Sequence, residues 1–114
     1  MESKREILTK TAKEYFESGK EELAKGRNNS AVVLFFKSLT ALTDIYLLIK
    51  TGRTPSSHNE RFFLTKEKSP EIYNLIDKDF PFYQDSYSMS LSKELAEVIK
   101  EDAEELAKKI GLKI

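Results

Sequence analysis

The stretch AVVLFFKSLTALTDIYLLIK, residues 31–50, decides the fold of this chain. It is apolar nearly all the way round a helix, which predicts a central helix that contacts neighbours on more than one side. Its length approaches that of a membrane span, but Lys37 and Asp44 interrupt it, and a charge near the centre of a membrane helix costs roughly 2.5 to 3.5 kcal/mol. We therefore expect a buried core helix and no membrane association.

The polar residues of this helix are not scattered. At 100° per residue, Lys37, Thr40, Asp44 and Thr51 fall on one narrow stripe. Polar groups on such an apolar helix need partners, so Lys37 and Asp44 are candidates for lining a cleft that takes a polar ligand. A stripe facing solvent explains them about as well. The large apolar surface also favours cover by a second subunit, which predicts a homodimer.

The residues before this helix predict an antiparallel neighbour. Apolar residues at steps of three and four from Leu8 to Leu23 indicate an amphipathic helix, and Gly26 is placed to end it. The linker holds three residues that can cap the next helix by accepting from its free amides: Asn28, Asn29 and Ser30.

The residues after Gly52 predict shorter helices. Ser57 and Glu60 form a capping box that begins one helix, and Pro70 begins another that should end at Pro81. Residues 80–87 hold four aromatic side chains in what we expect to be a loop. A last helix should run from near Ser92 to a stop at Gly111.

No segment shows the sustained alternation of a half-buried strand. The sequence therefore predicts one all-α domain over residues 1–114, an antiparallel up-and-down bundle of four to five helices. The absence of cysteine excludes thiolate chemistry and suits a cytoplasmic protein. Nineteen basic and nineteen acidic residues balance, so any binding of nucleic acid has to be local. We expect neither a cofactor nor a metal site.

Arg53 and His58, the only histidine of the chain, are the weak catalytic candidates. In a metal-independent RNase, a histidine can move the proton of the 2′-hydroxyl while an arginine holds the phosphate. More simply, His58 rides in the first turn of a capped helix and Arg53 decorates a loop. A third interpretation lies between these two: Arg53 and the helix start with Ser56, Ser57 and His58 are candidates for an anion site.

The pattern AKEYFESGKEELAKGRNNSAVVLFFKSLTALTDIYLLIKTGRTPSSHNERF, residues 12–62, resembles the HEPN family, the higher eukaryotes and prokaryotes nucleotide-binding domains, in its short free-standing prokaryotic branch. The resemblance implies a bundle of four or five helices that pairs into a homodimer. It also implies a small nucleotidyltransferase as partner, in toxin and antitoxin pairs, or RNase activity. The RNase signature of the family, an arginine and a histidine at the start of the last long helix, is missing here, since no arginine follows Arg61.

These observations favour a homodimeric HEPN-like module without catalytic activity, which binds a protein partner, a nucleotide or another anion. Two alternatives stay open. One is an RNase that uses Arg53 and His58, and the other is a helical protein-interaction domain unrelated to HEPN.

Overall fold

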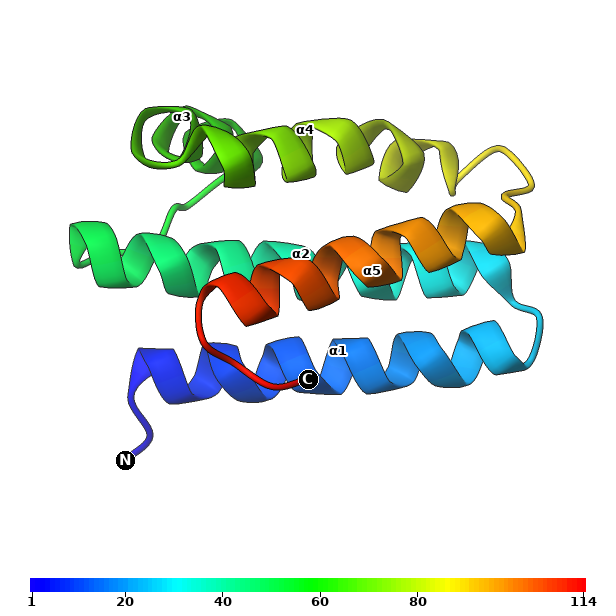
Figure 1. The fold of residues 1–114 in the computed structure, drawn as a ribbon, viewed down its shortest axis with the longest axis horizontal. Coiled ribbons are helices and arrows are strands. Elements are labelled where there is room, and N and C mark those ends of the chain that lie inside the picture. Colours follow the sequence, from blue (N-terminus) through cyan, green and yellow to red (C-terminus); the bar gives the residue numbers. More distant parts are fainter.

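The computed structural model describes every residue from Met1 to Ile114 and contains five α-helices and no strand. They are α1 (Lys4–Ala24), α2 (Asn28–Thr51), α3 (His58–Lys68), α4 (Pro70–Asp85) and α5 (Lys93–Lys109). Figure 1 shows that α1, α2, α4 and α5 run alternately in opposite directions, while the short α3 lies across them. The predicted all-α bundle is confirmed.

Helix α2 lies at the centre of the bundle, and 12 of its 24 residues are buried. It contacts all four other helices, α1 most extensively. It is long and apolar enough to cross a membrane, but more than half of that apolar segment is buried inside the bundle, as in the core helix of a globular protein. Part of its apolar surface stays uncovered, including the half-exposed Ile49, so the homodimer stays a prediction.

Three serines begin helices where the sequence predicts them. The side chains of Ser57, Ser69 and Ser92 accept hydrogen bonds from the amides three residues further on, so each satisfies a donor that a helix start leaves free. Gly52 ends α2 in the left-handed conformation, with φ of 80°. Gly52 and Ser57 thus mark where α2 ends and where α3 begins.

The start of α2 differs from the prediction. The helix begins at Asn28, its N-cap is Arg27, and no side chain caps it. Asn28 and Asn29 instead hold the turn between α4 and α5: Asn29 Oδ1 accepts from the Leu91 amide at 2.9 Å. Ser30 is exposed. The cap prediction is wrong because long-range partners compete for these amide side chains.

The course of α4 also differs from the prediction, which ends this helix at Pro81. The helix continues through Pro81 to Asp85, so most of the aromatic segment is helical and not a loop. The proline is exposed, while Tyr83 stacks on Phe36 with ring centroids 4.9 Å apart. Packing of the rings therefore outweighs the local preference of proline to end a helix.

Candidate functional site

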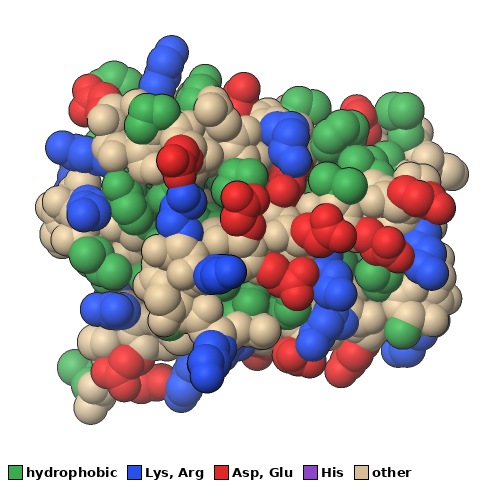
Figure 2. Space-filling view, in the orientation of Figure 1, with side chains coloured by type: hydrophobic (Ala, Val, Ile, Leu, Met, Phe, Trp, Pro, Cys, Tyr) green, Lys and Arg blue, Asp and Glu red, His purple; other side chains and the backbone are tan.

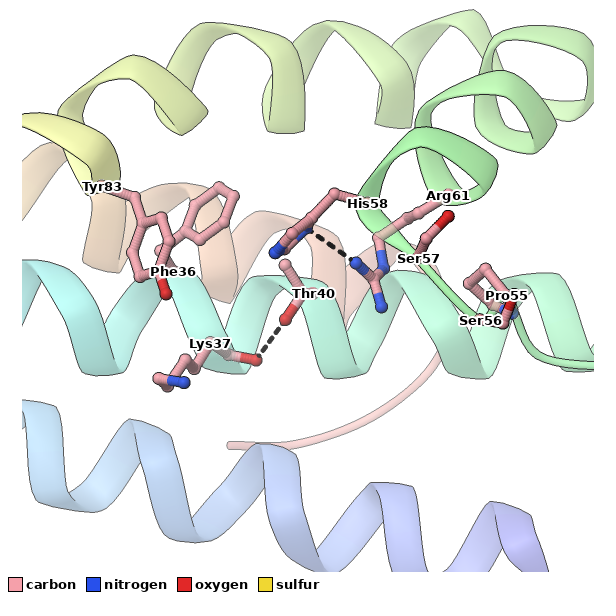
Figure 3. A pocket seen from close by; sticks show the side chains of 9 residues that line it. All are labelled: Phe36, Lys37, Thr40, Pro55, Ser56, Ser57, His58, Arg61 and Tyr83. Atoms are coloured by element: carbon pink, nitrogen blue, oxygen red, sulfur yellow. Dashed lines mark hydrogen bonds between the residues drawn. The ribbon is translucent and has the colours of Figure 1, made fainter.

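A cleft of about 300 Å³ opens between α2, the start of α3 and the end of α4. Figure 3 shows the side chains that line it, with α2 as the floor and α3 and α4 as the opposite wall. The nine lining residues are Phe36, Lys37, Thr40, Pro55, Ser56, Ser57, His58, Arg61 and Tyr83. Two of them carry a positive charge and none is a carboxylate.

Helix α2 supplies the polar floor of the cleft. Lys37 and Thr40 lie on the stripe that the helical period predicts, and the Thr40 hydroxyl donates to the Lys37 carbonyl at 2.9 Å. The Lys37 ammonium lies 5.9 Å from the centre of the Tyr15 ring and takes part in none of the ion pairs of the chain. It is therefore a cation available to a ligand.

Asp44 and Arg61 form the best-shielded ion pair of the chain. Arg61 donates from Nε to Asp44 Oδ1 at 2.7 Å and from Nη2 to Asp44 Oδ2 at 2.9 Å. The side chain of Arg61 is only 13% exposed and that of Asp44 only 12%. The third nitrogen, Nη1, lies 2.9 Å from Nδ1 of His58. The bidentate pair thus fixes the guanidinium, and the guanidinium in turn contacts the imidazole.

His58 has a pKa below its usual value. Partial burial against the bundle is the largest cause, followed by the positive charge of Arg61, while Asp44 acts in the opposite direction and Lys37 adds a further lowering. The ring packs against Phe80 with centroids 5.3 Å apart. At neutral pH the imidazole is therefore uncharged.

The start of α3 is occupied by its own carboxylate. Glu60 Oε1 accepts from the Ser56 amide at 3.3 Å, one residue before the position that a capping box predicts. The Ser57 hydroxyl accepts from the Glu60 amide at 3.1 Å. Arg53 lies 3.9 Å from the same Glu60 carboxylate. An anion in the cleft therefore has to be held mainly by side chains, since the helix start already has a negative partner.

Aromatic rings form the apolar wall. Tyr83 stacks on Phe36, and its hydroxyl lies 3.3 Å from that of Tyr87. This contact with Tyr87, followed by burial, raises the pKa of Tyr83, so the phenol stays protonated at neutral pH. The wall offers ring surface and hydroxyl groups without adding charge.

The structure brings together most of the residues that the sequence singles out. Lys37, Ser56, Ser57 and His58 line one cleft, and Asp44 lies behind it as the partner of Arg61. Arg53 is outside: its side chain is 65% exposed and it pairs with Glu60. The structure does not bring Arg53 to His58, which is the pair that the RNase alternative requires.

Five lining residues were not candidates from the sequence: Phe36, Thr40, Pro55, Arg61 and Tyr83. A signal for Arg61 was present, because residues three apart on a helix share a face and Arg61 follows His58 by three. A second signal was Asp44, because a carboxylate on an apolar helix predicts a cationic partner. Tyr83 carried no such signal, since its place depends on α4 continuing through Pro81.

No group of three or more histidine, cysteine, aspartate or glutamate side chains could hold a metal ion. The opposite face of the molecule, over α5, carries interspersed acidic and basic side chains in Figure 2 and no visible histidine. The cleft, by contrast, combines two cationic side chains with aromatic rings and contains no carboxylate in its lining.

Fold and cleft together define a small all-α bundle with a donor-rich cleft beside its central helix. No model of a known protein family matches the chain, and a search of curated proteins found no match.

Proposed function

We propose that this chain is a helical module that binds an anionic group of the phosphate type in the cleft beside α2. The observation that carries the proposal is the composition of the lining: Lys37 and Arg61 are present, and no carboxylate is. An oxyanion needs hydrogen-bond donors and positive charge, and both converge here.

The attraction for an anion is local. The whole chain is formally neutral, so no long-range field gathers anions from solution. Within the cleft, however, Lys37 is unpaired and only Arg61 is balanced, by Asp44. One uncompensated positive charge therefore lies beside the donors of the lining. This favours a small ligand with one anionic group over a long polyanion.

The aromatic wall extends the proposal to a nucleotide. A nucleotide has a flat base beside its phosphate, and the half-buried ring of Tyr83, which is backed by the buried Phe36, offers packing surface for a flat group. The resemblance to HEPN domains favours the same ligand class. The homodimer and a small nucleotidyltransferase as partner rest on that resemblance alone, and sedimentation of the purified chain with and without a candidate partner tests both.

Catalysis is not part of this proposal. An RNase needs its arginine and histidine at one phosphate, whereas Arg53 lies outside the cleft that holds His58. If the purified chain cuts RNA and Arg53→Gln abolishes the cutting, the RNase alternative replaces the present proposal.

Titration of the ¹⁵N-labelled chain with inorganic phosphate, followed by NMR, tests the anion site. We expect saturable shifts at residues of the cleft and about tenfold weaker binding in Lys37→Gln, because a hydrogen-bonded charge is lost. Lys50→Gln is the matched control, since Lys50 is also on α2 and lies 5.8 Å from a tyrosine ring, that of Tyr46. Absent shifts, or equal effects of the two substitutions, would contradict the proposal.

A further inference from the structure

The contact between Arg61 and His58 restricts the chemistry of the cleft. A guanidinium nitrogen can only donate, so at 2.9 Å from Arg61 Nη1 the Nδ1 atom of His58 has to accept. In a neutral imidazole, one ring nitrogen accepts and the other carries the proton. The proton of His58 is therefore on Nε2, on the opposite side of the ring from Arg61.

We infer that Asp44 and Arg61 are positioning residues that hold His58 as a neutral hydrogen-bond donor, so that the cleft selects a fully ionised oxyanion that only accepts. The inference rests on the proposed function and deepens it by naming the chemical class that the site takes.

The other polar groups of the cleft agree with this assignment. The Ser57 hydroxyl already accepts from the Glu60 amide, so its own proton is free to be donated. Arg61 uses three of its five N–H groups on Asp44 and His58, and Lys37 has only donors. The Thr40 hydroxyl donates its proton to the Lys37 carbonyl and can only accept from a ligand, so the preference for an accepting ligand rests on Lys37, Arg61 and the Nε2 proton of His58.

Burial, and after it the charged groups that face His58, keep the imidazole neutral. Arg61 on α3 and Lys37 on α2 oppose its protonation, and Asp44 on α2 is already engaged by Arg61 in two hydrogen bonds. From α4, His58 meets the uncharged rings of Phe80 and Tyr83. Protonation would also place an N–H on Nδ1 against a donor of Arg61. Below its lowered pKa, His58 therefore has to break this contact.

The same arrangement removes His58 as a general base through Nε2. A base needs a free lone pair, and in this tautomer the lone pair is on Nδ1, where Arg61 occupies it. The geometry thus assigns His58 to ligand binding, whereas an RNase mechanism would need it as a general base.

¹⁵N NMR of the ligand-free chain tests the tautomer without any anion. We expect one signal pair, with Nε2 protonated and Nδ1 unprotonated. In the double variant Asp44→Leu/Arg61→Met, an apolar pair of similar volume replaces the ion pair, which proteins commonly tolerate. There we expect a mixture of both tautomers and a higher pKa of His58. A proton on Nδ1 in the unmodified chain, or an unchanged ratio in the double variant, overturns the inference.

Sulfate binding tests what the tautomer does, because sulfate keeps its charge across the accessible pH range. We expect His58→Gln, whose amide still donates near the position of Nε2, to bind within about threefold of the unmodified chain, and His58→Leu to bind about tenfold more weakly. Equal losses in both variants, together with binding that strengthens as His58 gains a proton, would mean that its positive charge and not its N–H holds the anion.

The two experiments fail separately. If sulfate does not bind, the proposed function falls and with it the selectivity for an oxyanion, whereas the tautomer is decided by the ligand-free spectrum. If sulfate binds and Nδ1 carries the proton, the proposed function stands, but Asp44 and Arg61 do not set the tautomer of His58.

Discussion

Asp79 is the acidic side chain with no exposed surface at all, and neither of its carboxylate oxygens has a hydrogen-bond partner. It lies beside Asp102, which is bound by Lys78 at 2.7 Å. Burial, followed by the neighbouring Asp102, raises the pKa of Asp79 to about 8. At neutral pH this acid is protonated, which removes the cost of a buried charge.

The raised pKa predicts that the chain loses stability as the pH rises from about 4 to about 8. In that interval the folded chain holds a proton that the unfolded chain has released, so the free energy of unfolding falls by up to about 1.4 kcal/mol per pH unit. Asp79→Asn removes the carboxyl group that binds this proton. We therefore expect stability to depend less on pH in this variant, and its melting temperature to be higher above pH 8. Thermal unfolding by circular dichroism at a series of pH values measures both.

Asp77→Asn is the matched control for this prediction. Asp77 lies on the same helix two residues earlier, and its side chain is exposed. The control should keep the slope of the original chain. A slope that survives in Asp79→Asn would show that another group carries the proton.

Most candidate residues of the cleft could be predicted because their signals are local. Lys37 and Asp44 follow from helical periodicity, and Ser57 and His58 from the capping box. Arg53 failed as a cleft residue, since a separation in sequence says nothing about which carboxylate a flexible arginine meets, and here that carboxylate is Glu60. The role of Arg61 depends on contact between two helices, which no local pattern contains.

At the scale of elements, the contact between α1 and α2 depends on one glycine. A Cβ atom at Gly19 would lie 2.6 Å from Cε1 of Phe35, which is wholly buried. Gly19→Ala improves helix propensity, but we expect the overlap to outweigh that gain and to lower the free energy of unfolding by about 1 to 3 kcal/mol. Urea denaturation measures the change, and Glu17→Ala on the exposed side of α1 should cost little. Unchanged stability in Gly19→Ala would show that the two helices can separate without loss.

The turn between α4 and α5 depends on Asn29. Its side chain donates to the carbonyls of Ser86 and Met89 and accepts from the amide of Leu91. We expect Asn29→Ala to lower the free energy of unfolding by about 2 to 3 kcal/mol, because three hydrogen bonds are lost. Chemical denaturation tests this, with the exposed Ser30→Ala as control. Equal stability of the two variants would mean that the turn does not need the hydrogen bonds of the Asn29 side chain.

Element types were predictable where a cap and a periodic face agree, as at Ser57, Ser69 and Ser92. The end of α4 could not be predicted in this way. Pro81 locally favours the end of the helix, whereas the packing of Phe80 and Tyr83 on Phe36, which is distant in sequence, favours its continuation. The prediction of the start of α2 failed for the same reason. In both places a contact distant in sequence outweighed a local preference.

At the scale of the molecule, charge balance limits how a polyanion can bind. The cleft offers few cations to phosphate groups, because Lys37 is unpaired but Arg61 is already balanced by Asp44. With so few, we expect the affinity for a single-stranded oligonucleotide to fall less than about tenfold between about 50 and 200 mM salt. Fluorescence anisotropy measures this, and a much steeper dependence would point to a second, more extended basic surface.

The continuation of α4 past Pro81 gives the cleft two walls of unequal stiffness. Proline has no amide hydrogen, so the carbonyl one turn earlier, that of Asp77, lacks its helical donor. The turn that carries Tyr83 is thus tied to the rest of α4 by fewer hydrogen bonds, whereas the floor belongs to the most enclosed helix of the chain. Amide protons of residues 82–85 should exchange with solvent sooner than those of α2. The aromatic wall is therefore the part of the cleft that we expect to adapt to a ligand, while the central helix stays fixed.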